Sequence, residues 1–450
     1  MKAIGLDIGT TTICAIVIDT EEGKVLHAAS VANDAVINSE KPYERIQSPN
    51  KILEKCMSIV ENLVDRFAPI SCIGITGQMH GLLYIDKDGD AVSPLYYWQD
   101  ESGNQKYKDP ESFAQYLSRI TGYNMATGFG ATTYFCHNEN LIVPENAKSF
   151  CTIHDYVAMK LCENKMPIMH TSNAASYGLF DLNSLAFDRE AIEKSGLDYN
   201  MFPIVTSETK CLGFYEESIP VSVAIGDNQA SFLGSVNDVD SCILVNVGTG
   251  SQVSFSTELI QPHEGTELRP LIDDSYICVG SSLCGGRAFA MLEKFLRETA
   301  NLVAHDNIKS AYPAIDKYLE NSEMPEPPLD VSTRFSGSRE QPEERGSIKN
   351  IGTNNFNPQA LIWGILNGMV QELKSMYPFY GNTPHSVLIG SGNGLRKNKT
   401  LQNLFSKSFG MELKIPVHCE EAAFGAALFG MTASGIFESM KKAQSLIKYE

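Results

Sequence analysis

The chain of 450 residues is long enough for at least two domains with separate hydrophobic cores. Its formal net charge of −18 and pI near 5.0 argue against nucleic acid or an anionic membrane surface as a partner. The 11 cysteines lack CxxC or Cys/His zinc spacing, no apolar run could span a bilayer, and no apolar leader precedes the first strand. We therefore expect reduced thiols in a cytoplasmic protein.

A strand, a turn and a second strand are predicted over residues 2–18, with the sequence KAIGLDIGTTTICAIVI. Asp7 closes the first apolar run, and Gly9, Thr10 and Thr11 form the turn. A glycine lets the backbone approach a phosphate, hydroxyl and N–H groups donate hydrogen bonds, and the carboxylate would face the accompanying cation. Taken alone, this pattern is more often an ordinary turn, so phosphate binding needs a second observation.

Polar side chains follow the next predicted strand, residues 72–75, which comes after a predicted helix over 50–67. The sequence continues Gly77-Gln78-Met79-His80-Gly81. Strand ends are where an α/β domain offers side chains to a ligand. The alternative for His80 is a structural histidine with its hydrogen bonds satisfied internally.

A further apolar stretch at 95–98 ends in Trp98, Gln99 and Asp100. Trp98 is either a core residue or a hydrophobic wall for a polyol, and Gln99 and Asp100 would then bond the hydroxyl groups. Residues 127–133 form a glycine-threonine loop before another predicted helix.

The strand predicted at 221–225 is broken by Gly226, Asp227 and Asn228 before a helix of small residues at 230–234. Asp227 is either the helix N-cap or a functional carboxylate. The apolar pattern is interrupted shortly afterwards, so we place a domain boundary there, giving domains 1–236 and 237–450.

The second half repeats the first hairpin, because residues 243–256 read ILVNVGTGSQVSFS with Gly248, Thr249 and Gly250 at the turn. Two such hairpins favour two similar domains that bind one nucleotide. Residues 335–352 are irregular and predict an ordered functional loop. A helix over 360–377 has Gly364 and Gly368 on one face, which permits a close crossing. The strand at 387–389 leads into GSGNG rather than G-x-G-x-x-G, so a dinucleotide fold lacks support.

These halves resemble the actin–hexokinase–Hsp70 architecture of two α/β, ribonuclease-H-like domains around a hinged catalytic cleft. Within it, the chain is similar to FGGY-type carbohydrate kinases. The resemblance rests on six motifs in the family's order: DIGTT at 7–11, GQMHG at 77–81, GDN at 226–228, GTG at 248–250, GSGNG at 390–394 and EAAFGAA at 421–427.

Longer stretches look like the sedoheptulokinases of that family: ATGFG at 126–130, TIHDYV at 152–157 and NAAS at 173–176. Two positions depart from that pattern. Glu101 and Ser102 follow Asp100 where relatives often carry Gly-Arg, and Asn228 occurs as in xylulose kinases. The resemblance implies that both positions border the sugar, so it leaves the substrate open.

The resemblance implies an ATP-dependent transfer of phosphate to a sugar, with Asp227 as general base and Asp7 holding Mg²⁺. Gly9, Thr10 and Thr11 would meet the γ-phosphate; Gly248, Thr249 and Gly250 would bind phosphates from the other domain; and Gly392 and Asn393 would flank the adenosine. The sugar site would contain Gln78, Met79, His80, Trp98, Gln99, Asp100 and Asn228.

The expected substrate is a ketose phosphorylated at its terminal primary hydroxyl, with sedoheptulose first and a pentulose such as xylulose or ribulose second. Domain closure is expected when ATP and sugar bind. A remote alternative is a non-metabolic nucleotide clamp of the same fold, although no residues remain for a peptide-binding domain. The sequence leaves the oligomeric state open, with a homodimer as one option.

Overall fold

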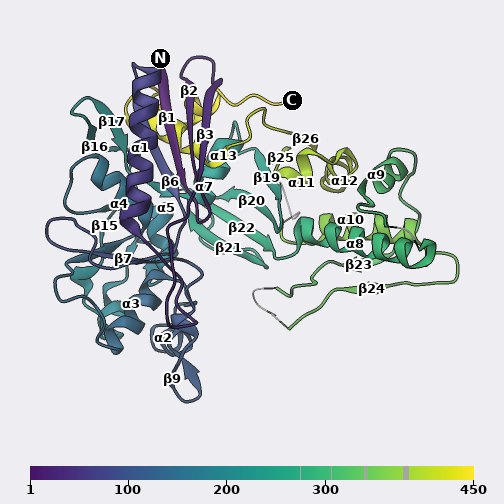
Figure 1. Cartoon of the computed structure of the whole chain (residues 1–450), viewed down its shortest axis with the longest axis horizontal. Helices are drawn as coiled ribbons and strands as arrows, with labels where there is room; N and C mark the ends of the chain where they lie inside the picture. Colours follow the sequence, from purple (N-terminus) through teal and green to yellow (C-terminus); the bar gives the residue numbers. More distant parts are fainter. Residues whose placement is uncertain (274, 306, 339–340, 342, 379–384) are drawn as a thin grey trace. The chain divides into compact units, whose positions relative to one another are not determined.

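The computed structural model describes residues 1–450 except 274, 306, 339–340, 342 and 379–384 (Figure 1). The chain forms two compact units. The first comprises Met1–Asp238, Arg269–Ile277 and Glu420–Lys448, and the second comprises Val239–Leu268, Cys278–Cys419 and Tyr449–Glu450. The division expected from the sequence was contiguous, whereas the first unit also includes two later segments of the chain.

The first unit is built on a sheet with the order β16-β17-β6-β1-β2-β3, in which β18 also pairs with β6. β1 runs antiparallel to β2 and parallel to β6. The strands are β1 (Lys2–Ile8), β2 (Thr12–Asp19), β3 (Val25–Ala32), β6 (Cys72–Gly77), β16 (Cys211–Tyr215), β17 (Ile219–Ser222) and β18 (Ile225–Gly226).

Alternation along β1 divides its side chains between two faces of the sheet. Ile4, Leu6 and Ile8 join the core that also contains the buried stripe of α1 (Pro49–Phe67). That helix starts where the Ser48 side chain accepts a hydrogen bond from the Lys51 N–H. The opposite face, which includes Gly5 and Asp7, is therefore turned toward α13 (Glu421–Ala433).

Helix α13 crosses the sheet in direct backbone contact. A Cβ added to Gly5 would lie 1.9 Å from the Ala423 oxygen, and one added to Gly74 would lie 1.7 Å from the Ala426 oxygen. Gly425 makes an equally close approach to Ala230 of α7 (Asp227–Ser235). The helix contains the EAAFGAA motif of residues 421–427, and its many small residues permit this crossing.

A second, largely aromatic core lies beside this sheet within the first unit and includes Tyr84, Phe135, Phe150 and Tyr177. The short elements of this unit are β4 (Val36–Ile37), β5 (Ile46–Gln47), β7 (Leu83–Ile85), β8 (Leu95–Tyr96), β9 (Lys106–Lys108), β10 (Glu111–Ser112), α2 (Phe113–Thr121), α3 (Gly130–Glu139), β11 (Ser149–Cys151), α4 (Ile153–Leu161), β12 (Ile168–His170), α5 (Thr171–Ala174), β13 (Phe180–Asp181), β14 (Ala186–Phe187), α6 (Arg189–Lys194), β15 (Ile204–Thr206) and α14 (Met440–Gln444).

The second sheet has the order β21-β22-β20-β19-β25-β26. Its strands are β19 (Cys242–Val247), β20 (Ser251–Thr257), β21 (Thr266–Pro270), β22 (Tyr276–Ser282), β25 (Val387–Ser391) and β26 (Glu412–Lys414). The helices of the second unit are α8 (Gly285–Ala304), α9 (Tyr312–Glu320), α10 (Pro358–Ser375), α11 (Asn393–Arg396) and α12 (Lys399–Phe409). As in the first unit, a β-hairpin opens the sheet and a parallel strand, β25, adjoins it.

Helix α10 makes the close crossing expected from its glycines, and its partner is the hairpin of β23 (Asp330–Ser332) and β24 (Ser347–Lys349). A Cβ on Gly368 would lie 2.3 Å from the Val331 oxygen. The expectation of an irregular loop at 335–352 is wrong for residues 347–349, which pair as a strand, while residues 339, 340 and 342 lie outside the described part. Across the described residues, no helix has both the length and the apolar character needed to cross a membrane.

Candidate active site

The first predicted phosphate loop is a tight hairpin between β1 and β2, with Ile8 paired to Ile13. The Gly9 N–H donates to the Thr12 oxygen at 2.9 Å. A Cβ at Gly9 would lie 2.8 Å from that same oxygen, so the turn closes only around glycine. Thr11 is exposed at the tip, and its carbonyl accepts a hydrogen bond from the Asn33 N–H. The exposed tip leaves room for an anion.

Thr10 links this hairpin to two predicted sugar-site residues. Its Oγ1 donates to Gln78 Oε1 at 3.1 Å and accepts from Trp98 Nε1 at 2.9 Å. Gln47 completes the cluster, because its Nε2 donates to the Thr10 oxygen and its Oε1 accepts from Gln78 Nε2, both at 2.9 Å. Four segments that are distant in the sequence therefore meet in one polar network. Gln47 was not predicted, since a single glutamine in a two-residue strand carries no sequence signal.

The Trp98 side chain is 46% exposed, so the core-packing alternative for it is wrong. Gln99 is also exposed, and its side chain forms no hydrogen bond with the described residues. Asp100 differs, because it is buried and its carboxylate accepts from the backbone N–H groups of Arg45 and Ser102 at 2.9 and 3.0 Å. Burial raises its pKa, and these hydrogen bonds oppose the rise. Asp100 therefore anchors the loop that presents Trp98.

His80 has a φ of 70°, a backbone conformation that is uncommon for a residue other than glycine. Its backbone N–H donates to Ser176 Oγ at 3.1 Å, and its Nδ1 lies 2.7 Å from the Ser176 oxygen, so Nδ1 carries the hydrogen. The ring stacks on Phe129 with centroids 4.9 Å apart. The contacts with Ser176 and Phe129 fix the orientation of the imidazole ring. This arrangement suits either a structural histidine or a histidine oriented in advance for contact with a ligand.

Asp227 is the first residue of α7, and Gly226 occupies the N-cap position without a side-chain cap. The N-cap alternative for Asp227 is therefore wrong. Burial is the main cause that raises the pKa of this carboxyl, whereas the Asn228 side chain, which donates to Asp227 Oδ1 at 3.0 Å, and the Arg269 charge act in the opposite direction. The carboxylate is thus partly withdrawn from solvent and has donors that favour its ionised form.

The segment before Asp227 is held by two residues that were not predicted, Ser172 and Gln229. Ser172 Oγ accepts from the Gly226 N–H at 3.2 Å, and Gln229 Nε2 donates to the Ser172 and Pro270 oxygens, both at 2.9 Å. Met79 packs directly beneath Gly226, where its sulfur would lie 2.8 Å from an added Cβ. These contacts position the start of α7 and leave no room for a larger residue at Gly226.

Asp7 lies near two further carboxylates. Cys14, its partner across the hairpin, donates its Sγ–H to Glu420 Oε2 at 3.4 Å. Burial first, and then the charges of Asp227 and Glu420, raise the pKa of Asp7 to about 7. Glu420 precedes α13 and was not predicted, because only the sheet's alternation and the helix crossing bring it beside Asp7.

This concentration of carboxylates fits a divalent cation, since carboxylate oxygens are the ligands that Mg²⁺ prefers. Within the described ranges, no three His, Cys, Asp or Glu side chains converge closely enough to form a metal cage by themselves. The fit is therefore to a hydrated ion that Asp7 would contact through water, with the remaining ligands supplied by a nucleotide.

The second unit brings its own predicted residues together. The Gly248 N–H donates to the Gly250 oxygen at 2.9 Å, and the Gly286 and Arg287 N–H groups donate to the Gly248 and Thr249 oxygens at 2.9 and 3.1 Å. The start of α8 thus fixes the turn. Gly392 has a φ of 83°, and a Cβ there would lie 2.6 Å from the Val247 oxygen, just before the turn. Asn393 then begins α11.

A buried polar cluster lies next to the end of β6, where a Cβ added to Gly77 would lie 3.2 Å from the His154 Cβ. Asp155 Oδ2 accepts from Thr152 Oγ1 at 2.6 Å and from Asn173 Nδ2 at 2.7 Å, while Asp155 Oδ1 has no hydrogen-bond partner. Burial raises the pKa of Asp155 from the ordinary 3.8 to about 7, against the opposing effect of these hydrogen bonds. The folded state therefore favours the neutral acid.

We expect Asp155→Asn to change how stability depends on pH. Between pH 4 and 7 the unfolded chain releases this proton before the folded one does, so the free energy of unfolding of the wild type falls as the pH rises. The variant has no such proton to release, so its free energy of unfolding should increase relative to that of the wild type as the pH rises toward 7. Thermal melts at several pH values, with the exposed Asp65→Asn as control, test this, and parallel pH profiles for wild type and Asp155→Asn would contradict it.

The family model described as FGGY family of carbohydrate kinases, N-terminal domain, matches residues 2–234. The chain belongs to the FGGY family of carbohydrate kinases. It is an ATP-dependent carbohydrate kinase whose substrates are ATP and a small-molecule sugar. The alternative of a non-metabolic nucleotide clamp is therefore set aside.

Among curated proteins, the chain is 27% identical to the sedoheptulokinase of Mus musculus over 94% of this chain and 96% of that protein. Among solved structures, it resembles gluconate kinase from Lactobacillus acidophilus, with TM-score 0.85, 18% identity, and coverage of 100% of this chain and 92% of that one. Ligand-bound xylulose kinase from the same organism gives TM-score 0.83 at the same identity and coverage. The predicted pair of ribonuclease-H-like domains is confirmed.

Proposed function

We propose that this kinase phosphorylates the terminal primary hydroxyl of a seven-carbon ketose, sedoheptulose, to give the 7-phosphate. The observation that carries the proposal is the network joining Thr10, Gln78 and Trp98 in the unit that also holds Asp7 and Asp227. It connects a phosphate hairpin directly to polar and aromatic groups suited to a polyol. The similarity to sedoheptulokinases along nearly the whole chain supports the choice of sugar.

Asp227 is the proposed general base. Phosphoryl transfer passes through a loose transition state, so the sugar hydroxyl must be aligned in line and its proton accepted late. A carboxylate held by Asn228 and facing Arg269 can take that proton, and the contacts of Ser172 and Gln229 keep its backbone in place. Most of the acceleration should come from this positioning and from charge neutralisation.

The phosphates of ATP are proposed to bind at Gly9, Thr10 and Thr11 and at Gly248, Thr249 and Gly250, with Gly392 and Asn393 beside the adenosine. Mg²⁺, when bound, would neutralise charge on the transferred phosphoryl group. Asp7 would orient its water shell, and Glu420 lies close enough to Cys14 to add negative charge on the same face of the sheet.

The sugar is proposed to lie against the exposed Trp98 ring, with its carbonyl end at Gln78 and His80 and its terminal hydroxyl at Asp227. Met79, Gln99, Asp100 and Asn228 complete the proposed site, with Asp100 acting through the loop that it anchors. A pentulose is two carbons shorter, so it would leave either the base or the anchoring groups unpaired. An unsatisfied buried polar group costs roughly 1–3 kcal/mol.

Because the shorter pentulose leaves a buried polar group unpaired, kcat/KM for sedoheptulose should exceed that for xylulose by about tenfold to a hundredfold. Both values should be measured on one preparation at fixed ATP and Mg²⁺, with ADP release coupled to NADH oxidation. Xylulose is the second candidate because Asn228 matches the xylulose kinase pattern. An equal or higher kcat/KM for xylulose would reject sedoheptulose and leave the kinase activity intact.

A further inference from the structure

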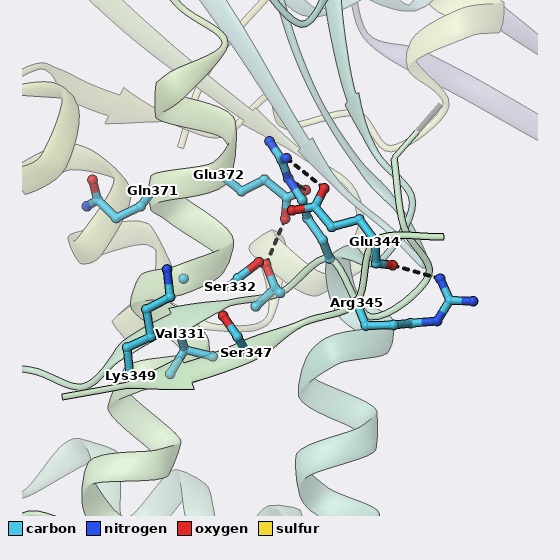
Figure 2. Close-up of a pocket in the computed structure, with 11 residues that line it drawn as sticks. Val331, Ser332, Glu344, Arg345, Ser347, Lys349, Gln371 and Glu372 are labelled. Carbon is cyan, nitrogen blue, oxygen red and sulfur yellow. Dashed lines mark hydrogen bonds and ion pairs between the residues drawn. The ribbon is translucent and has the colours of Figure 1, made fainter. Parts of the chain in front are cut away.

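A polar cavity of about 330 Å³ lies in the second unit between the β23–β24 hairpin and α10 (Figure 2). This volume is at the lower end of the roughly 300–1,000 Å³ that small-molecule sites occupy. None of the residues proposed for ATP or sugar binding lines it. The lining residues are Val331, Ser332, Thr333, Arg334, Glu344, Arg345, Ser347, Lys349, Gly368, Gln371 and Glu372.

The two carboxylates of this cavity are already engaged. Arg334 Nη1 lies 2.9 Å from Glu344 Oε2, and Arg334 Nε lies 3.7 Å from Glu372 Oε1. Thr333 Oγ1 also donates to Glu372 Oε2 at 2.7 Å. Figure 2 shows Glu344 and Glu372 on the side of the cavity away from Lys349. Because Arg334 offsets much of the charge of its two partners, the acidic groups do not dominate the lining.

Positive charge and hydroxyl groups gather on the hairpin. The register pairs Ser332 with Ser347, and Lys349 follows two residues later, on the same face of β24. Figure 2 shows the Lys349 side chain rising from β24 toward the helix that carries Gln371. Within the described residues the Lys349 ammonium has no ion pair or hydrogen bond. Asp330 lies opposite Lys349 in the strand register but forms no ion pair with it. The hairpin thus offers an unpaired ammonium next to two hydroxyls.

We propose that this cavity binds a small phosphate monoester of a hydroxylated carbon chain, at a site separate from catalysis. An ammonium and two hydroxyls can each donate to a phosphate oxygen, and lysine serves as a point charge for phosphate. The other polar groups of the lining suit hydroxyls on the rest of the ligand. The site goes beyond the proposed sugar kinase function, because no step of phosphoryl transfer uses it.

Ribose 5-phosphate is a suitable probe, titrated calorimetrically into the full chain with AMP-PNP and sedoheptulose present to occupy the catalytic residues. Lys349→Gln removes the proposed anchor, and Lys407→Gln makes the same change at another exposed lysine of the second unit. Ribose and inorganic phosphate are titrated separately, to measure how much the sugar and the phosphate group each contribute to binding.

We expect the wild type and Lys407→Gln to bind ribose 5-phosphate equally, and Lys349→Gln to bind it about tenfold to a hundredfold more weakly. Ribose should not bind measurably, and inorganic phosphate should bind more weakly than the ester. Turnover of Lys349→Gln without the probe should equal that of the wild type, which separates this site from the catalytic one. Equal affinity in the two lysine variants, or binding of inorganic phosphate as tight as that of the ester, would overturn the proposal.

Discussion

Asp227→Asn is expected to lower turnover by about 10²-fold or more while leaving the fold and ATP binding nearly unchanged. The amide is almost isosteric with the carboxyl and can keep one oxygen toward the Asn228 side chain, which donates to Asp227 Oδ1 at 3.0 Å. It cannot accept the proton of the sugar hydroxyl. Turnover at saturating ATP and sugar, together with the Kd for a non-hydrolysable nucleotide, measures both parts of the prediction.

The matched control is Asp65→Asn, which makes the same chemical change at an exposed position on α1. It should retain wild-type turnover. If the purified Asp227→Asn enzyme also turned over at a near-normal rate, Asp227 would have no part in the proton transfer.

Gly74→Ala is expected to destabilise the first unit by about 3 kcal/mol or more. The added methyl group would lie 1.7 Å from the Ala426 oxygen and 2.4 Å from the Ala426 carbonyl carbon, both of them backbone atoms. Neither can turn aside as a flexible side chain would, so α13 must move off β6. Urea denaturation followed by circular dichroism measures the loss.

Gly352→Ala serves as the control because the nearest atom to its added methyl group is 3.8 Å away. It should change the denaturation midpoint little. If the two variants unfolded at the same urea concentration, the close crossing of α13 over the sheet would be incorrect. If Gly74→Ala gave no folded protein while Gly352→Ala folded normally, that result would also support the close crossing.

The parts of the fold and site that the sequence predicts are those where one short segment carries the whole signal. The turns at Gly9 and Gly248 need glycine for close backbone contacts, and the helix at 421–431 needs small residues for its crossing. Such requirements are local, so they are visible as motifs. The family resemblance rests on the order of these motifs along the chain, and it supplied their expected roles.

Other site residues act only through contacts made by the folded chain. Gln47, Ser172 and Glu420 come from separate segments and reach Thr10, Gly226 and Cys14 only after the sheet and α13 have assembled. No spacing in the sequence marks them. The strand at 347–349 was missed for a similar reason, since three residues are too few to form a recognisable pattern and only the pairing with β23 defines them.

The central claim is that ATP is consumed only to phosphorylate a sugar, with Asp227 as the base. It is tested most directly by measuring ADP release from wild type and Asp227→Asn with and without sedoheptulose. We predict rapid release only from the wild type with sugar present, in step with formation of a sugar phosphate. Equal ADP release with and without the sugar, or undiminished release by Asp227→Asn, would contradict the account.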